Sequence, residues 1–346
     1  MKDINIRITG RAGRITLQRP DALNAMTYEM CTAIEAALMD WKTNDAVDLV
    51  IIDALGSRAF CAGGDIADLY QSGLDRNYAF GQKFWADEYR LNALIAGYPK
   101  PYIALMQGFT MGGGVGISCH GSHRIVGETS QIAMPECGIG LVPDVGGSYI
   151  LARAPGYLGE YLGLTADRMG PKDAIEVGFA DHFIPQDRWA VMTKELEQTG
   201  DPEVVKTYIS DAPAGKLADA LPMINSAFQS GDLSTIVSEL SHQDSSFAEK
   251  TLKAMGRNSP LSMACALKII EQLRDSSGDL EMALRCEYRF TARAMEFGDF
   301  LEGIRAAIID KDRTPNWQHH MSSVPSADIE HMLSNLGAME LRLQER

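Results

Sequence analysis

Short apolar runs alternate with longer helical patterns through roughly the first 190 residues, and this alternation constrains the fold more than any other feature of the chain. Six runs predict strands, at residues 4–8, 14–18, 47–53, 102–106, 124–127 and 131–134. Five patterns predict helices, at about 27–43, 77–97, 112–121, 147–163 and 171–178. This order is typical of βα units, and the nearly continuous apolar character of the strands predicts a sheet that is covered on both faces.

Strand patterns end near residue 200, and the rest of the chain is predicted to be helical. The helices are expected at 215–229, 232–241, 260–274, 279–297 and 299–309. Ser259 before Pro260 predicts a helix N-cap, and Asp299 with Glu302 predicts a capping box. We therefore predict an α/β fold with two regions, a core at 1–195 that carries the active site and an all-helical region at 196–346.

The composition is that of a globular protein and excludes several classes of partner. The 346 residues are 45% hydrophobic and 23% charged, and the net charge is −14. Such an acidic chain is a poor candidate for binding nucleic acid or an anionic membrane by general electrostatics. Residues 101–123 contain no charged residue but six glycines, which favours a buried strand and helix over a membrane span. No signal-peptide pattern is present at the N-terminus, so we predict a cytoplasmic location.

Three glycine-rich segments lie between strand and helix patterns, at residues 60–66, 111–116 and 143–147. None matches a Walker A loop or the dinucleotide-binding glycine pattern. Glycine allows close backbone approach, so N–H groups in two such segments could form an oxyanion hole. The alternative is that these glycines serve only tight turns and close helix packing.

Two acids accompany the glycine segments and could act together. Glu136 follows an apolar run and lies eight residues before Asp144. Neighbouring acids in a partly apolar pocket can take different pKa values, one charged and one protonated. The alternative is a pair of solvated surface carboxylates. The six scattered cysteines predict reduced, buried thiols, and neither a thiol nucleophile at Cys61 or Cys119 nor a metal site is expected.

Several segments together resemble the crotonase (enoyl-CoA hydratase/isomerase) superfamily in order and spacing. They are residues 15–20 with Asn24 and Ala25, 59–66, 100–104 with Gly108, 111–114, and Pro135 with Glu136. The resemblance implies a spiral of ββα turns, followed here by a C-terminal helical region that covers the CoA groove. It places the thioester oxygen between the backbone N–H groups of Gly64 and Gly113. It implies an acyl-CoA substrate, no separate cofactor, and a possible homo-oligomer, since family members form trimers or hexamers.

The departures from the family pattern bear on the reaction. Family hydratases use two glutamates, but Gly116 stands at the position of the first, and only the second is kept as Glu136. The hydrolase branch of the superfamily has an aspartate at the position of Asp144. The resemblance therefore implies hydrolysis of a short-chain 3-hydroxyacyl-CoA, with 3-hydroxyisobutyryl-CoA as the expected substrate and Glu136 and Asp144 as the catalytic acids. The alternatives are an enoyl-CoA hydratase or isomerase reaction and a non-catalytic acyl-CoA binder.

The residues expected to bind the substrate follow from the same resemblance. They are Asp21, Ala22, Leu23, Ala62, Asp65 and Ile66. A family lysine is replaced by Asp21, so the phosphates of CoA need other cations, for which Arg19, Arg58 and Lys311 are candidates. Each of these three could equally be an ordinary surface cation.

Overall fold

The computed structural model describes residues 2–343 as two compact units that interleave along the chain. The first unit comprises the described residues of Met1–Asp65, Arg90–Ala133 and Arg168–Lys216. The second comprises those of Ile66–Tyr89, Met134–Asp167 and Leu217–Arg346. The expected α/β class is confirmed, whereas the expected boundary between residues 195 and 196 stays a prediction.

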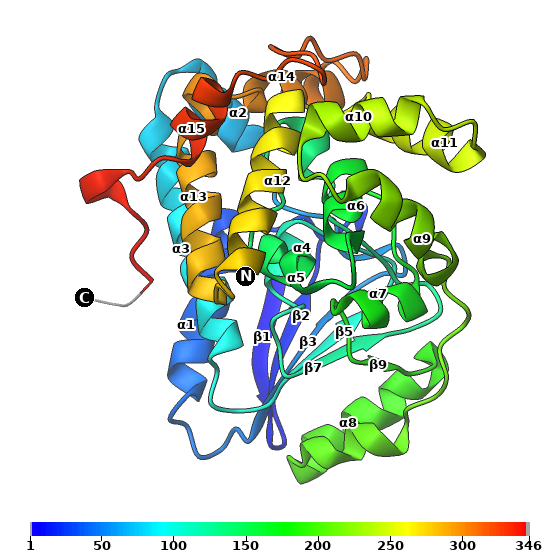
Figure 1. Ribbon diagram of the computed structural model, residues 1–346. Coiled ribbons are helices and arrows are strands. Elements are labelled where there is room, and N and C mark those ends of the chain that lie inside the picture. The colour runs from blue at the N-terminus through cyan, green and yellow to red at the C-terminus, as the bar shows by residue number, and fades with distance from the viewer. Residues whose placement is uncertain (1, 344–346) are drawn as a thin grey trace. The chain divides into compact units, whose positions relative to one another are not determined.

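All described strands belong to the first unit and form two sheets, of which Figure 1 labels the strands of the larger one. The six-stranded sheet has the order β1 (Ile4–Thr9), β2 (Ala12–Leu17), β3 (Leu49–Ala54), β5 (Tyr102–Met106), β7 (His123–Val126) and β9 (His182–Phe183). Only β1 and β2 pair antiparallel in it. The parallel three-stranded sheet contains β4 (Ala59–Cys61), β6 (Phe109–Met111) and β8 (Gln131–Ala133). Because β3, β5 and β7 are each followed by a strand of the smaller sheet, the chain winds through both sheets as a spiral.

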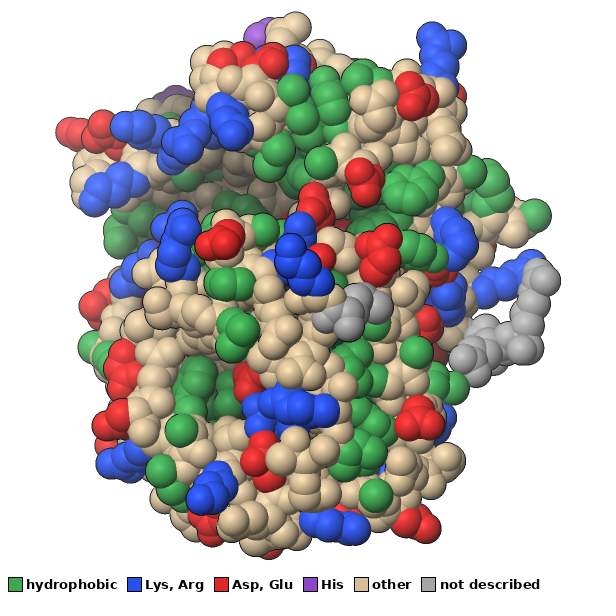
Figure 2. Space-filling view, turned by 180° about the vertical axis from the view of Figure 1, so that it is seen from behind, with side chains coloured by type: hydrophobic (Ala, Val, Ile, Leu, Met, Phe, Trp, Pro, Cys, Tyr) green, Lys and Arg blue, Asp and Glu red, His purple; other side chains and the backbone are tan. Residues whose placement is uncertain are grey.

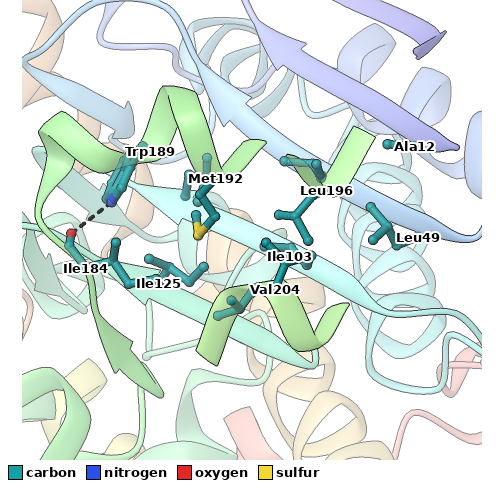
Figure 3. Close-up of a cluster of buried hydrophobic side chains, with 12 residues drawn as sticks. Ala12, Leu49, Ile103, Ile125, Ile184, Trp189, Met192, Leu196 and Val204 are labelled. Carbon is teal, nitrogen blue, oxygen red and sulfur yellow. Dashed lines mark hydrogen bonds between the residues drawn. The ribbon is translucent and has the colours of Figure 1, made fainter. Parts of the chain in front are cut away.

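Helix α8 (Trp189–Thr199) buries an apolar face in the core of the first unit (Figure 3). Trp189, Met192 and Leu196 recur at helical spacing and pack with the sheet residues Ile103 and Ile125. The indole N–H of Trp189 donates to the carbonyl oxygen of Ile184 at 2.8 Å, so its buried polar atom is satisfied. The other helices of this unit are α1 (Tyr28–Trp41), α4 (Gly113–Gly116) and α7 (Pro171–Val177).

The described part of the second unit contains helices and no strands. Helix α3 (Tyr78–Ala96) begins in this unit and ends in the first. The other helices are α2 (Ala67–Leu74), α5 (Gly147–Arg153), α6 (Leu158–Thr165), α9 (Leu217–Phe228), α10 (Leu233–Ser241), α11 (Ser246–Met255), α12 (Pro260–Asp275), α13 (Leu280–Phe297), α14 (Phe300–Ile304) and α15 (Ser326–Leu333). Helix α12 packs against α5, α6 and α13, and Ser259 caps its first turn as predicted. No helix in the described part of the chain is long and apolar enough to cross a membrane.

The sequence predictions miss helices α2, α8, α11 and α15, and they also fail where elements are very short or where a predicted helix is interrupted. Strands β4, β6 and β9 have only two or three residues, too few to show a pattern. The helix expected at 112–121 ends after Gly116, and the one expected at 147–163 is divided into α5 and α6. Pro155 and Gly156 lie at that division, where proline removes a backbone donor and Gly156 has a φ of +57°.

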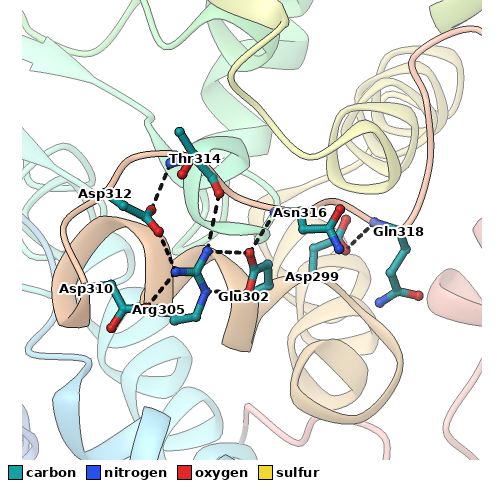
Figure 4. Close-up of polar contacts among 8 residues, drawn as sticks. All are labelled: Asp299, Glu302, Arg305, Asp310, Asp312, Thr314, Asn316 and Gln318. Atoms are coloured by element: carbon teal, nitrogen blue, oxygen red, sulfur yellow. Dashed lines mark hydrogen bonds and ion pairs between the residues drawn. The ribbon is translucent and has the colours of Figure 1, made fainter.

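The predicted capping box at Asp299 is wrong. Asp299 makes no side-chain cap; its carboxylate instead accepts from the Ser259 hydroxyl at 2.6 Å and from the Gln318 N–H at 3.1 Å. Glu302 binds Arg305 at 2.7 Å rather than reaching back to the helix start (Figure 4). Distant partners of Asp299 and the neighbouring Arg305 therefore take the place of the expected cap.

Close contact between α4 and β4 predicts that Gly114 cannot carry a side chain. A Cβ at Gly114 would overlap the carbonyl oxygen of Cys61. Gly114→Ala should lower the free energy of unfolding by about 1–3 kcal/mol, because backbone atoms must move apart. Chemical denaturation measures this loss. Gly170→Ala is the matched control, since a Cβ there meets nothing within 4 Å. Equal stability of the two variants would contradict the close contact.

Candidate active site

Buried carboxyl groups gather in the second unit, and both expected catalytic acids are among them. Glu136 starts a 3₁₀ turn (Glu136–Ile139), and Asp144 lies in the loop before α5. They are only 4% and 5% exposed. The Oε2 atom of Glu136 has no hydrogen-bond partner among the described residues. A buried carboxylate oxygen without a donor is costly, and it is available to a substrate or water molecule.

The environment favours different charge states for the two acids. Burial raises the pKa of Glu136 well above its usual value, and the nearby charge of Asp144 raises it further. Burial also raises the pKa of Asp144, to about 6, but the hydrogen bond from Tyr89 opposes that rise. The Tyr89 hydroxyl donates to Asp144 Oδ2 at 2.7 Å. Near neutral pH the free protein therefore holds its charge on Asp144 and a proton on Glu136.

Sequence reasoning missed the residues that hold this acid pair. Tyr89 is fully buried on α3, and Glu287 on α13 accepts hydrogen bonds from the loop that follows Asp144. One signal could have identified Glu287. It lies at helical spacing with Ala283, Phe290 and Ala294, so it interrupts an apolar stripe with an acid. No local pattern distinguishes Tyr89 from a core tyrosine.

In the first unit the structure brings together the two segments that carry Gly64 and Gly113. Strands β4 and β6 are parallel neighbours, so the glycine segments that follow them leave the same edge of the sheet. Gly64 lies in a backbone bridge with Met26, and Gly113 begins α4. No acceptor for either N–H group occurs among the described residues. Two free, neighbouring backbone donors can hold a developing oxyanion.

Some of the residues expected to bind substrate are joined in the first unit, but one of them belongs to the second unit. Asp21 and Ala22 form an exposed 3₁₀ turn, and the carbonyl oxygen of Leu23 accepts from the Ala62 N–H at 3.1 Å. This bond joins two of the expected binding segments within the first unit. Ile66 belongs to the second unit, where it precedes α2.

Among the three candidate cations for the CoA phosphates, Arg19 already has acidic partners. It binds Asp65 at 2.9 Å and lies 3.7 Å from Asp3, so much of its charge is neutralised. Asp65 thereby fixes its own loop through Arg19, a role that the sequence did not suggest. Arg58 has no ion pair within residues 2–343.

Lys311 is exposed and lies in the sequence between Asp310 and Asp312, two members of a network of charged side chains around Arg305. Figure 4 shows this network. Arg305 binds Glu302, Asp310 and Asp312, each at 2.7 Å, and thus holds the turn in place. Lys311 has a φ of +59° and no ion pair among the described residues. Elsewhere on the surface, Figure 2 shows a face on which basic and acidic side chains are interspersed.

The described residues offer neither a metal site nor a reactive thiol of the kind weighed above. No group of three or more His, Cys, Asp or Glu residues within 2–343 could hold a metal ion. All six cysteines are free and buried, as the sequence predicted. Burial raises the pKa of Cys119 to about 11, so this side chain is a neutral thiol near pH 7.

The chain is similar over almost its whole length to curated relatives. The rat protein 3-hydroxyisobutyryl-CoA hydrolase, mitochondrial, is 38% identical over 345 residues, which cover 96% of this chain and 89% of the relative. The human protein of the same name is 35% identical over 353 residues, covering 99% and 91%. These relatives are named as mitochondrial proteins, which contradicts the expected cytoplasmic location.

Solved structures share the fold closely. An enoyl-CoA hydratase from Rhodobacter sphaeroides is 52% identical with a TM-score of 0.94, covering 98% of this chain and 99% of that one. A carnitinyl-CoA dehydratase from Mycobacterium thermoresistibile is 35% identical with a TM-score of 0.94, covering 100% of both. Residues 12–333 match the enoyl-CoA hydratase/isomerase family model. The resemblance found in the sequence is thus confirmed, and the chain belongs to the enoyl-CoA hydratase/isomerase family, with the crotonase fold.

Proposed function

We propose that this protein hydrolyses a short-chain 3-hydroxyacyl-CoA, with 3-hydroxyisobutyryl-CoA, an intermediate of valine breakdown, as the preferred substrate. The relatives named for that reaction support the proposal. The observation that carries it is the pair of buried acids, in which Asp144 is bound by Tyr89 and Glu136 keeps one carboxylate oxygen without a partner. Such a pair can move a proton between its members during the reaction.

In the proposed mechanism Glu136 works in its charged form. It either attacks the thioester carbon, giving a mixed anhydride and CoA thiolate, or removes a proton from the attacking water. The C–S bond breaks in both routes, the thiolate takes up a proton, and water supplies the oxygen of the free acid. Asp144 orients the water or the substrate hydroxyl and exchanges the proton with Glu136.

The proposed site also includes two backbone N–H donors, which would form an oxyanion hole. The N–H groups of Gly64 and Gly113 would hold the carbonyl oxygen as negative charge develops on it. Loss of one such donor typically costs about 2.7–4 kcal/mol of transition-state stabilisation. CoA would be bound largely by backbone groups around Asp21, Ala22 and Leu23, and no cofactor beyond the CoA of the substrate takes part.

A second candidate is hydration of an enoyl-CoA. It is favoured by the Rhodobacter sphaeroides structure that is 52% identical and is named as an enoyl-CoA hydratase. Against it stands Gly116, a buried residue without a side chain at the position where the family hydratases carry their first glutamate. A residue that lacks an ionisable group can neither donate nor accept the second proton that hydration requires.

The direct test measures both reactions in parallel. Thiol release from 3-hydroxyisobutyryl-CoA, followed with a thiol reagent, should be rapid, while the enoyl absorbance of crotonyl-CoA should stay constant. Glu136→Gln should lower kcat by about 10²–10⁴-fold with little change in the Kd for the CoA ester, because the acid acts in chemistry rather than binding. Glu160→Gln is a matched buried control that should retain kcat. Hydration without thiol release would favour the second candidate.

The pH dependence should report the interaction between the two acids. Activity should rise with pH as Glu136 loses its proton, and the midpoint should lie well above the usual pKa of a glutamate. Asp144→Asn removes the negative charge that raises the pKa of Glu136. It should therefore move the midpoint to lower pH while lowering the maximal rate about 100-fold or more. An unmoved midpoint would contradict the coupling.

Burial of Glu136 should make the protein less stable as pH rises. Its folded-state pKa is raised, so the folded protein binds more protons than the unfolded chain above about pH 4.5, and stability falls through that range. Glu136→Gln should raise Tm by about 2 °C at pH 8, and the gain should shrink near pH 4.5. Differential scanning calorimetry measures the Tm of both proteins at pH 8 and near pH 4.5. Glu160→Gln should instead lower Tm at pH 8, since it breaks the ion pair with Arg274.

A further inference from the structure

We propose that Glu287, on α13 of the C-terminal helical region, is the positioning residue for Asp144. The inference rests on the proposed function in one respect only, the assignment of Asp144 to the reaction. Glu287 is fully buried, and its carboxylate faces the short segment that joins Asp144 to α5. Because solvent cannot reach the Glu287 carboxyl oxygens, their hydrogen-bond donors must come from that segment.

Three donors, one from Gly146 and two from Ser148 in the first turn of α5, converge on this carboxylate. Oε2 accepts from the Gly146 N–H at 2.8 Å, and Oε1 accepts from the Ser148 N–H at 3.2 Å. The Ser148 hydroxyl donates to the same Oε1. A single side chain thus fixes two backbone N–H groups within four residues of Asp144, and both N–H groups would otherwise be buried without a partner.

The loop needs such support because its backbone is strained. Val145 has a φ of +52°, which is unfavourable for a β-branched residue, and Gly146 has a φ of +79°. This left-handed pair of residues directly follows Asp144 and sets the direction of its side chain. Removal of the Glu287 carboxylate should allow the loop to relax, and Asp144 would then move away from the Tyr89 hydroxyl.

The same helix also contacts the other support of Asp144. Thr291, one turn after Glu287, places Oγ1 3.4 Å from the Tyr89 hydroxyl, and the Tyr288 ring packs edge-on against the Tyr89 ring with centroids 6.3 Å apart. Helix α13 therefore acts on Asp144 in two ways, through Tyr89 and through the loop. Through these contacts the C-terminal region would take part in positioning the acid pair.

Other ionisable groups around this arrangement are buried acids. Glu88 on α3 and Glu136 both interact electrostatically with Asp144, and Glu287 does so as well. Burial raises the pKa of Glu287 to about 8, so it contributes little charge near neutral pH and acts mainly through its hydrogen bonds. Its effect on Asp144 should accordingly be geometric.

The test combines turnover with a titration that does not depend on any substrate. Glu287→Ala should lower kcat about 100-fold with KM changed less than about threefold, because a displaced acid affects chemistry more than binding. In ¹³C NMR of protein labelled at aspartate, the Asp144 carboxyl should titrate at higher pH than in the wild type, since loss of the Tyr89 hydrogen bond removes the contact that lowers its pKa. Glu287→Gln keeps one acceptor oxygen and the side-chain volume. It should therefore bring both kcat and the Asp144 titration part of the way back to the wild-type values.

Glu160→Gln is the control for loss of a buried acid, and it should leave kcat and the Asp144 titration unchanged. Should Glu287→Ala not fold, Glu287→Asp replaces it, because the shorter side chain keeps the carboxyl group but cannot span both N–H groups. Wild-type kcat and an unmoved Asp144 titration in either folded variant would overturn the positioning role. If the wild type releases no thiol, the proposed function fails, and the NMR titration still decides the role of Glu287.

Discussion

The hydrogen bond from Tyr89 to Asp144 determines what the buried acids of the second unit can do. Without a donor, a carboxylate that is 5% exposed would be held neutral by its surroundings. The phenol donor at 2.7 Å favours the charged form of Asp144, and that charge in turn keeps the proton on Glu136. Burial and the charge of Asp144 raise the pKa of Glu136, whereas the hydrogen bond from Tyr89 limits the rise for Asp144, so two buried carboxyl groups favour different charge states.

In the first unit, the spiral of strands accounts for the positions of the two backbone N–H donors of Gly64 and Gly113. Each turn of the chain adds one strand to the large sheet and one to the small sheet, and parallel pairing brings the ends of β4 and β6 to one edge. The segments that leave this edge must pass very close to each other, which is why Gly114 contacts the backbone of Cys61. The glycines serve this packing, and the N–H groups of Gly64 and Gly113 have no acceptor within residues 2–343, so the packing role is compatible with the proposed oxyanion hole.

Sequence patterns predicted most long elements, but they missed helices α8 and α11 and several strands that depend on distant pairing. Strands β1, β2, β3, β5 and β7 of the large sheet and helices α1, α12 and α13 are apolar or amphipathic over enough residues to be recognised. The three-residue strands β4 and β6 were not recognised in the sequence, and each pairs with a strand from a neighbouring turn of the spiral. Asp299 and Glu302 match a capping box in spacing, but Ser259, Gln318 and Arg305 provide them with other partners.

The sequence by itself determined the family, the fold and the acids and glycines proposed to act on the substrate, because these residues occur in local motifs with fixed spacing. Only the tertiary structure decided how those acids are held. Tyr89 and Asp144 are 55 positions apart, and Glu287 and Gly146 are 141 apart, so no local pattern relates them. Burial and hydrogen bonding set the charge and direction of a carboxylate, and both depend on which distant segments pack around it.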